Sequence, residues 1–353
     1  MSCSARAGFW KFNDPFKPIL RARTRPFPPR VGLAADFRVT TMISEPNPTP
    51  FVGRLAPSPT GGLHVGHART FLIAWLAARS AGGRIILRIE DIDAGRVRDE
   101  ARRAAATDLE WLGLDWDEGP HLQSERLTLY DEALQGLKAA ELVYPCTCTR
   151  ADIERAASAP HPQDEGPTYP GTCAHRTAAD ARALGDRPFA WRFRTPAEVV
   201  AWDDLVLGRR ENAPAQLGGD FVVARNAVGP SYQLAVVVDD ALMGVTQVIR
   251  GADLATSTPR QILLYRALGW TVPRFGHVGL VIGPDGRRLA KRDGAVKLAT
   301  LREQGVDPRA LIGELAQSCG WSNEPTPSRP SEWIDRFRFG TLGEESWTWT
   351  PGA

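Results

Sequence analysis

Two histidines, His64 and His67, stand three residues apart where an apolar helical pattern begins. A turn rich in proline and glycine, residues 57–62, comes just before them. The start of a helix offers free N–H groups and the positive end of the dipole, which together bind phosphate. Imidazoles placed there can donate to phosphate oxygens as negative charge develops. Gly66 would let a nucleotide approach the backbone. The string therefore predicts a nucleotide site at a strand-to-helix turn.

A second group of charges follows a short apolar run. Arg88, Glu90, Asp91 and Asp93 occur in the string Arg-Ile-Glu-Asp-Ile-Asp. Three carboxylates at the end of a strand suit an ammonium group or a metal ion. A charged surface turn would account for the same residues, so this string leaves both interpretations open.

A third candidate is basic and lies far downstream, at residues 283–294. A glycine-rich turn leads into Lys291 and Arg292, and a lysine on a loop is a good point charge for a triphosphate. A solvated basic loop is the alternative. The chain contains neither GxxxxGK[ST] nor GxGxxG, so a P-loop and a dinucleotide fingerprint are not indicated.

Five cysteines are too few and too unevenly spaced for a disulfide framework. Cys3 and Cys319 are isolated, whereas Cys146, Cys148 and Cys173 are clustered. A reducing, cytoplasmic location is expected, and the cluster is then a candidate metal site. No apolar run approaches the ~20 residues that span a bilayer, so no membrane partner is expected.

The charge is uneven along the 353 residues. Residues 1–41 carry eight Arg or Lys against two Asp, and the whole chain is +2, so the remainder is −4. A nucleic-acid partner would need a local basic patch. The leader resembles a transit peptide, but a disordered extension or a misassigned start upstream of Met42 is favoured. We expect a chain shortened to begin at Met42 to keep its melting temperature and activity, because residues 1–45 offer almost no periodic apolar face.

Strands alternate with helices on both sides of a less regular middle. This order favours an α/β fold with a doubly wound, parallel sheet. The middle, from about 151 to 219, is rich in Pro, Gly, Ala and Arg and is interpreted as an insertion. The end of the chain shows no helical stripe, so a loosely packed tail is expected. The predicted strands are Phe51–Leu55, Arg84–Ile89 and Gln233–Val238, and the predicted helices are His64–Ala81, Glu100–Leu112, Leu127–Ala140 and Gln261–Leu268.

Taken together, HVGH near the start and RLAKR downstream resemble the HIGH and KMSKS signatures of class I aminoacyl-tRNA synthetases. The strings GRLAPSPTGGLHVGHARTFLIAW, LRIEDID and TPRQILLYRALGW resemble the glutamyl-tRNA synthetase catalytic core. AVVVDD, IRGADL and the short length resemble its truncated relatives, the glutamyl-Q tRNA(Asp) synthetases. The resemblance covers about Gly53 to Trp321. It implies a Rossmann-like, HUP-type sheet with an inserted zinc-containing subdomain and no anticodon-binding domain, since only about thirty residues separate Lys291 from the Pro-rich tail.

The resemblance also implies roles for individual residues. Glutamate would be held by the stretch from Arg54 to Ser58, by Glu90 at its ammonium group, by Tyr232, and by Arg250 at its side-chain carboxylate. ATP would be bound at its phosphates by Lys291. RLAKR departs from KMSKS at Arg288 and Arg292, which leaves the activation rate open. The expected glutamate-binding residues are Arg54, Leu55, Ala56, Pro57, Ser58, Glu90, Tyr232 and Arg250, and the expected catalytic and ATP-binding residues are His64, Gly66, His67 and Lys291.

The cysteine cluster resembles the family's zinc site of three Cys and one Tyr. Cys146, Cys148, Tyr169 and Cys173 would hold one structural Zn²⁺ in a closed tetrahedral site. Tyrosine is an uncommon ligand, so His161 or His175 are alternatives to it, and three reduced thiols without metal are the alternative to zinc.

The implied reaction has two steps. Glutamate attacks ATP, with Mg²⁺ as companion, to give glutamyl-adenylate, and a queuosine hydroxyl in the anticodon loop of tRNA(Asp) then takes the glutamyl group. Charging of the tRNA(Glu) 3′ end and a non-catalytic tRNA- or glutamate-binding paralogue are the alternatives, and a monomer is expected. The implied organisation is a disordered or misassigned extension at 1–50, the first catalytic half at 51–145, the zinc insertion at 146–219, the second catalytic half at 220–300, a short helical end at 301–322 and a tail at 323–353.

Overall fold

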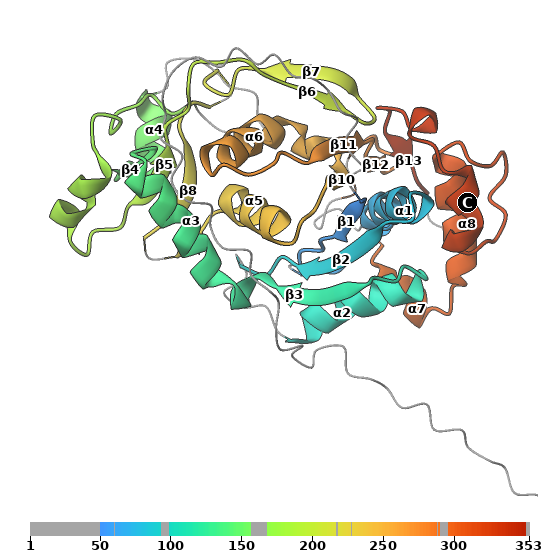
Figure 1. Cartoon of the computed structure of the whole chain (residues 1–353). Helices are drawn as coiled ribbons and strands as arrows, with labels where there is room; N and C mark the ends of the chain where they lie inside the picture. Colours follow the sequence, from blue (N-terminus) through green and yellow to red (C-terminus); the bar gives the residue numbers. More distant parts are fainter. Residues whose placement is uncertain are drawn as a thin grey trace, which may run out of the picture.

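The computed structural model describes residues 50–59, 61–92, 99–156, 168–216, 218–226, 228–287, 289 and 296–350. A parallel sheet lies at its centre (Figure 1). Strands β1 (Val52–Leu55), β2 (Arg84–Ile89) and β3 (Glu118–Leu122) are adjacent and parallel, and β10 (Gln247–Gly251) pairs in parallel with β11 (Arg274–Val278). The Thr246 N–H donates to the Val52 carbonyl at 2.9 Å, so β10 lies beside β1. The strand order β3-β2-β1-β10-β11 is that of the predicted doubly wound sheet.

The side chains of β2 show why this sheet has helices on both faces. Ile85, Leu87 and Ile89 pack into one apolar core with α1 (Val65–Ser80) and α2 (Asp99–Trp111). Ile86 points the other way, into a second core with α3 (Leu127–Ala139), α5 (Tyr232–Leu242) and α6 (Thr258–Ala267). A strand buried on both faces is typical of a parallel sheet.

One predicted strand is wrong. Residues 233–238 lie inside helix α5, not in a strand. Leu234 to Val238 are all buried, so the segment is apolar all round and carries no period that separates a helix from a strand. Its β-branched valines favoured the strand, and burial in the second core outweighs that preference.

The middle of the chain forms a small antiparallel sheet beside α3, at the left of Figure 1. Trp191, Phe193 and Phe221 from this sheet join the second core, so the insertion shares the apolar interior of the catalytic sheet. The insertion contains β4 (Val143–Cys146), α4 (Arg150–Ala156), β5 (Ala190–Phe193), the hairpin β6 (Val200–Asp204) and β7 (Gly208–Asn212), β8 (Phe221–Arg225) and β9 (Gly229–Pro230).

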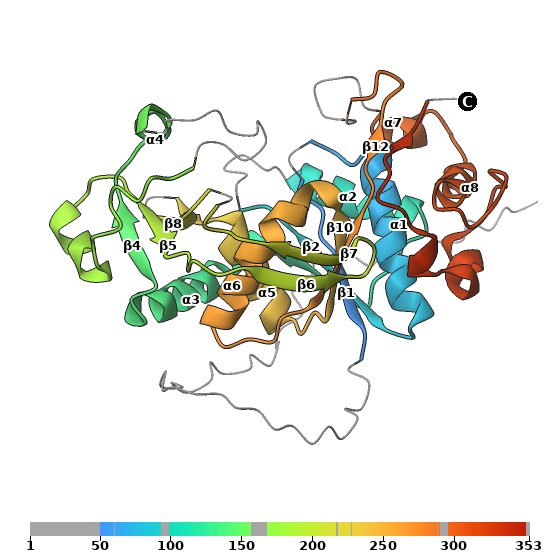
Figure 2. The same ribbon diagram turned by 90° about the horizontal axis from the view of Figure 1, so that it is seen from above.

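The end of the chain packs on α1, on the opposite side from the insertion (Figure 2). Trp333 and Trp349 are buried in the first core, and β13 (Trp347–Thr348) pairs with β12 (Val281–Ile282). The expectation of a loosely packed tail is therefore wrong for residues 323–350. Large aromatic side chains anchor this segment without any helical stripe. Its other elements are α7 (Leu298–Glu303), α8 (Pro308–Ser318) and 3-10 helices at Pro330–Arg336 and Phe339–Thr341, and further 3-10 helices lie at Gln123–Glu125, Ala178–Leu184 and Ala252–Ser257. Among the described residues, no helix has both the length and the apolarity to cross a membrane.

Candidate active site

The two histidines form the N-terminal cap of α1. The Nδ1 atom of His64 accepts from the Gly66 N–H at 3.1 Å, and Nδ1 of His67 accepts from the His64 N–H at 3.3 Å. Because Nδ1 is the acceptor in each ring, the hydrogen of the neutral imidazole is on Nε2. Both rings therefore carry an Nε2–H donor at the end of the helix that attracts anions. A Cβ on Gly66 would lie 2.9 Å from the His64 ring, so the cap itself requires this glycine.

Both ends of the basic loop lie beside this cap. Before the loop, Val281 of β12 has its Cβ 3.6 Å from the position of a Cβ on Gly66. After the loop, Lys297 forms a β-bridge with His64. The segments that flank the basic loop are thus neighbours of the histidine cap. Lys291, together with Arg288 and Arg292, lies outside the described residues.

Arg54, Glu90, Tyr232 and Arg250 lie close enough together for their charges to interact. The Arg54 Nη1 atom donates to the carbonyl of Ile249 at 2.9 Å, because β1 and β10 are neighbours. Burial raises the pKa of Glu90, with the nearby guanidiniums opposing the shift. Burial also raises the pKa of Tyr232, whose phenol feels the charges of Arg250, Glu90 and Arg54. The four predicted glutamate ligands that carry polar groups therefore share one electrostatic environment.

A second set of charges, which the sequence interpretation missed, fixes this environment. Arg88 is fully buried and bonds Asp240 at 2.5 Å and Glu90 at 3.0 Å, with Asp239 3.6 Å from its Nε. Burial acts to lower the pKa of Arg88, but these carboxylates outweigh it and raise the pKa well above its usual value. Asp239 also accepts from Arg126 at 2.6 Å. The sequence does contain a signal for these residues. Arg88 interrupts the apolar run Arg84–Ile89, and Asp239 and Asp240 follow three valines.

Arg250 differs from Arg88 in its partners. Its guanidinium donates to His277 Nε2 at 3.0 Å, Gln261 Oε1 at 2.8 Å, Thr258 Oγ1 at 2.8 Å and the Leu254 carbonyl at 3.3 Å. Within the described part of the chain, no carboxylate lies within 4.0 Å of it. Arg250 is 5% exposed, so its positive charge is buried among neutral acceptors.

The remaining residues of the predicted glutamate stretch and acidic string have separate places. Leu55 and Pro57 are buried, Ala56 is half-buried and Ser58 is exposed. Asp91 accepts from the Ser124 N–H at 2.8 Å and forms an ion pair with Arg102, whose Nε is 2.8 Å away. Asp91 therefore stabilises the segment after β3 and does not lie with Glu90 at the candidate site. Asp93 lies outside the described residues.

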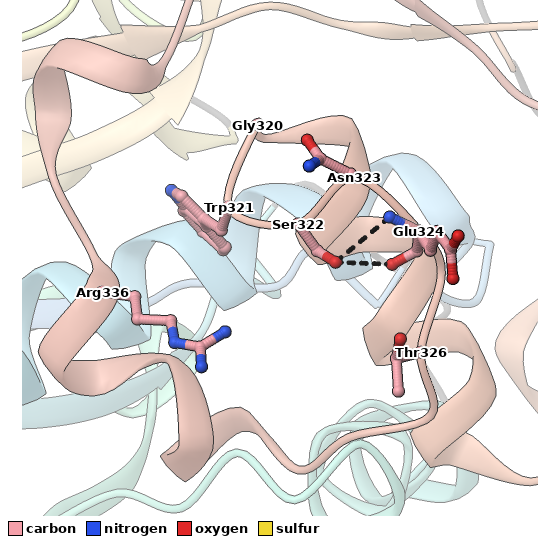
Figure 3. Close-up of a pocket in the computed structure, with 7 residues that line it drawn as sticks. All are labelled: Gly320, Trp321, Ser322, Asn323, Glu324, Thr326 and Arg336. Atoms are coloured by element: carbon pink, nitrogen blue, oxygen red, sulfur yellow. Dashed lines mark hydrogen bonds between the residues drawn. The ribbon is translucent and has the colours of Figure 1, made fainter.

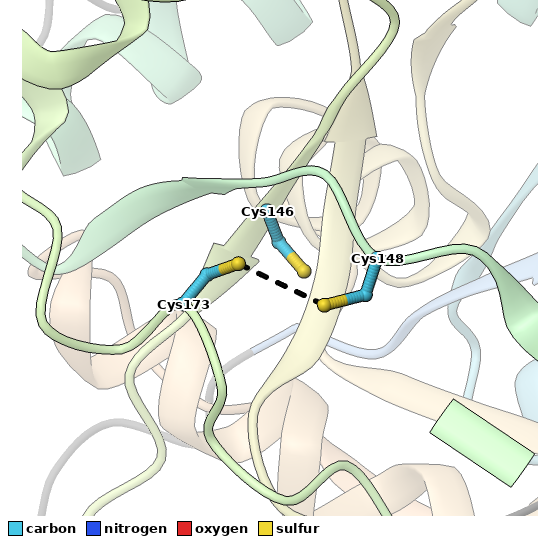
Figure 4. Close-up of side chains that lie close together, drawn as sticks. All are labelled: Cys146, Cys148 and Cys173. Atoms are coloured by element: carbon cyan, nitrogen blue, oxygen red, sulfur yellow. Dashed lines mark hydrogen bonds between the residues drawn. The ribbon is translucent and has the colours of Figure 1, made fainter. Parts of the chain in front are cut away.

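Three thiols meet in the insertion (Figure 4). The Sγ atoms of Cys146, Cys148 and Cys173 all lie within 4.8 Å of one another. The Tyr169 Oη is 3.3 Å from the Cys146 Sγ and accepts from the Cys173 N–H at 2.8 Å, so the four predicted ligands are together. Burial and the neighbouring thiols raise the pKa of Cys148 to about 12. His175 is exposed, and His161 lies outside the described residues. Three soft sulfur donors and one oxygen donor fit a tetrahedral Zn²⁺.

A pocket at the end of α8 is separate from all of these groups. Trp321 and Arg336 stand on one side of it, with Asn323, Glu324 and Thr326 opposite (Figure 3). Residues 320–336 build it, and none of them is a predicted site residue. The buried charges around Arg54 and Arg250 are therefore the better candidate for chemistry.

Residues 51–329 match the family described as tRNA synthetases class I (E and Q), catalytic domain. The chain is a member of this family, in the group of the glutamyl-Q tRNA(Asp) synthetases. A relative with that name from Symbiobacterium thermophilum is 53% identical over 305 residues, which is 83% of this chain and 94% of the relative. The glutamate--tRNA ligase of Geobacter sulfurreducens is 45% identical over 84% of this chain and 63% of its own length.

A solved structure has the same fold. The glutamate tRNA ligase from Elizabethkingia meningosepticum, in complex with its amino acid, gives a TM-score of 0.73 at 28% identity, over 86% of this chain and 67% of that one. The predicted class I catalytic fold is thus confirmed. The family match makes this chain a ligase of the aminoacyl-tRNA synthetase type.

Proposed function

We propose that this chain activates L-glutamate with ATP and transfers the glutamyl group to queuosine in tRNA(Asp). The observation that carries the glutamate assignment is the pair of buried guanidiniums, Arg54 and Arg250. Asp240 is 2.5 Å from Arg88 but 3.8 Å from Arg54, so its charge belongs mainly to Arg88. Arg54 has only a long ion pair and Arg250 has only neutral partners among the described residues, so these two buried cations favour a ligand with two negative charges.

Glutamate matches this arrangement group by group. Its side-chain carboxylate would pair with Arg250, near Tyr232, and Arg54 would face its α-carboxylate. Its ammonium group would bind Glu90, whose Oε1 already bonds Arg88. A dicarboxylic amino acid needs a cation for each carboxylate and an anion for its amine, and these residues supply all three. Leu55 to Ser58 would form the backbone wall next to Arg54.

The histidine cap would serve ATP. In activation, a carboxylate oxygen of glutamate attacks the α-phosphorus, the bond to the leaving pyrophosphate breaks, and glutamyl-adenylate forms. His64 and His67 would donate their Nε2–H groups to phosphate oxygens, and Lys291 would reach them from the basic loop. Gly66 lies against the His64 ring. Mg²⁺ would accompany the triphosphate. A queuosine hydroxyl then attacks the acyl carbon, and AMP leaves with the proton that the hydroxyl loses.

Transfer distinguishes this proposal from its nearest alternative. Relatives named glutamate--tRNA ligase also match most of this chain, which favours charging of tRNA(Glu) as the second candidate. Labelled glutamate should pass to tRNA(Asp) that carries queuosine, and neither to tRNA(Asp) without queuosine nor to tRNA(Glu). Labelling of tRNA(Glu) alone would select the second candidate, and no labelling of either would favour a non-catalytic paralogue.

Activation should need no tRNA. All the polar contacts proposed for glutamate come from the buried cluster of this chain, so an occupied tRNA site is not required to assemble them. Glutamate-dependent exchange of pyrophosphate into ATP is therefore expected from the protein alone. Exchange that begins only after tRNA is added would count against this organisation of the site.

We further propose that Cys146, Cys148, Tyr169 and Cys173 hold one structural zinc per chain. The ion would join β4 to the loop after residue 168 and would take no part in either chemical step. Cys148→Ser should release zinc, measured by elemental analysis, and lower the melting temperature more than it changes the KM for ATP. Cys319→Ser is the control for zinc content, because Cys319 is a free cysteine outside the cluster. Zinc-free native protein of full activity would contradict the proposal.

A further inference from the structure

Buried, hydrogen-bonded side chains connect Arg250 to His277 and then to Asp204. Arg250 and His277 are register partners on the parallel strands β10 and β11. The Arg250 Nε–H donates to Nε2 of His277 at 3.0 Å. The other ring nitrogen, Nδ1, lies 2.5 Å from Oδ2 of Asp204. His277 is 0% exposed and Asp204 is 5% exposed, so neither hydrogen bond is an ordinary surface contact.

The donors around the imidazole select one tautomer. Arginine has no acceptor and never loses its proton in proteins, so Nε2 of His277 must be the acceptor. The hydrogen of the neutral ring then sits on Nδ1 and is donated to Asp204. Burial lowers the pKa of His277, with the Asp204 hydrogen bond opposing, so the ring stays neutral.

Asp204 is itself held in one orientation by the backbone. Its Oδ1 accepts from the N–H groups of Val206 at 3.1 Å, Leu207 at 3.0 Å and His277 at 3.0 Å. The first two donors belong to the tight turn between β6 and β7, and the third belongs to β11. The other oxygen, Oδ2, is therefore the atom left to face the imidazole. Oδ2 also accepts a longer hydrogen bond from Trp202 Nε1 at 3.4 Å. The insertion hairpin thus fixes a carboxylate behind the ring that supports Arg250.

We propose that Asp204 and His277 are positioning residues for the side-chain specificity of this enzyme. They hold the guanidinium of Arg250 by its Nε. Gln261, Leu254 and Thr258 accept three of its four Nη hydrogens, and the remaining one, on Nη1, would face the side-chain carboxylate of glutamate. This inference rests on the role proposed above for Arg250. It also gives the β6–β7 hairpin a part in amino-acid recognition, although the hairpin carries none of the residues that would touch glutamate.

Asp204→Asn is the sharpest test, because it acts on Arg250 only through the tautomer. The amide oxygen must stay on the three backbone N–H groups, so the NH₂ group faces Nδ1 of His277. Nδ1 must then accept, and the ring hydrogen moves to Nε2, where it faces the Nε–H of Arg250 and the Oγ1 of Thr258, 3.1 Å away. The Nε–H of Arg250 loses its acceptor in a buried site, so the KM for glutamate in pyrophosphate exchange should rise about 5- to 150-fold. The KM for ATP should stay within about twofold.

Two variants of His277 separate its two hydrogen bonds. In His277→Gln, the side-chain oxygen can still accept from Arg250, although the donor to Asp204 is lost. His277→Leu removes the acceptor as well, so it should raise the KM for glutamate at least as much as Asp204→Asn. Once Gln occupies position 277, adding Asp204→Asn should cause little further loss, since no tautomer remains to be changed. Asp203→Asn is the control, because Asp203 is the exposed neighbour on the same strand.

The outcomes separate this inference from the proposed function. Equal rises in the KM for glutamate and for ATP, or fully additive effects of Asp204→Asn and His277→Gln, would mean a general structural role and would overturn the inference. If Arg250→Gln impairs glutamate use while Asp204→Asn leaves it unchanged, the inference fails and the proposed function stands. If Arg250→Gln itself has no effect, both fail. Should Asp204→Asn not fold, the comparison of His277→Gln with His277→Leu decides.

Discussion

Arg250→Gln should lower glutamate-dependent pyrophosphate exchange by a factor of hundreds to thousands and leave the KM for ATP within about twofold. The glutamine side chain cannot neutralise a carboxylate, and a buried charge left without its partner costs about 3–5 kcal/mol. The same argument makes glutamine a poor substrate of the wild-type enzyme, because its amide offers no charge and turns N–H donors toward arginine donors. Aspartate should fail because it is one methylene too short to reach Arg250 while its ammonium group remains on Glu90.

The ratio of the exchange activity with glutamate to the exchange activity with glutamine should fall in the Arg250→Gln enzyme. Steady-state exchange with each amino acid at varied concentration measures it. Arg274→Gln is a suitable control, because Arg274 begins the adjacent strand and is exposed. If the variant keeps its preference for glutamate, the specificity residue is misplaced, and Arg54, with a hydrogen bond from Tyr232, becomes the next candidate.

Arg88→Met should destabilise the fold by about 3–5 kcal/mol, which is a large part of the stability of a typical domain. The variant would leave Asp239, Asp240 and Glu90 without the guanidinium that lies between them. Arg84→Met is the matched control on the same strand. Arg84 is exposed, its partner Glu118 is 3.3 Å away at the surface, and loss of such a pair costs only about 0–1 kcal/mol. The free energy of unfolding in denaturant measures both changes.

The same variant predicts a dependence on pH with a definite sign. Arg88 opposes the effect of burial on Glu90, so without it the pKa of Glu90 should rise further above its value in the unfolded chain. Such a group destabilises the fold at pH values above its unfolded pKa of about 4, and the penalty fades as the pH falls toward that value. The stability difference between wild type and Arg88→Met should therefore shrink between pH 7 and pH 5. A difference below about 1 kcal/mol at pH 7 would show that Arg88 does not hold these carboxylates together.

The sequence predicted the site in pieces because each piece carries its own local signal. His64 and His67 are recognisable at a helix start, and the alternating strands and helices indicate the doubly wound sheet. These inferences use short spacings, where backbone geometry limits the outcomes. The zinc ligands were instead implied by the resemblance to a family, because Tyr169 and Cys173 stand far along the chain from Cys148. The strand predicted at residues 233–238 was wrong, because local backbone geometry does not distinguish a helix from a strand there. A segment buried on every side has no period, and only its neighbours decide between helix and strand.

The resemblance to a family implied that Arg54, Glu90, Tyr232 and Arg250 bind one ligand, but it did not give the residues that surround them. By itself the sequence determined the fold class, the residue types at the site and the charges that a glutamate ligand would meet. The tertiary structure decided which charges are already paired. Arg88 is paired with Asp239 and Asp240. Arg250 is surrounded by neutral acceptors, one of which, His277, is in turn held by Asp204. Arg88 contacts aspartates that are more than a hundred positions away in sequence. Arg250 is held by contacts across two parallel strands and a hairpin. Pairing at such separations depends on how the sheet and its helices pack, so no local pattern in the sequence records it.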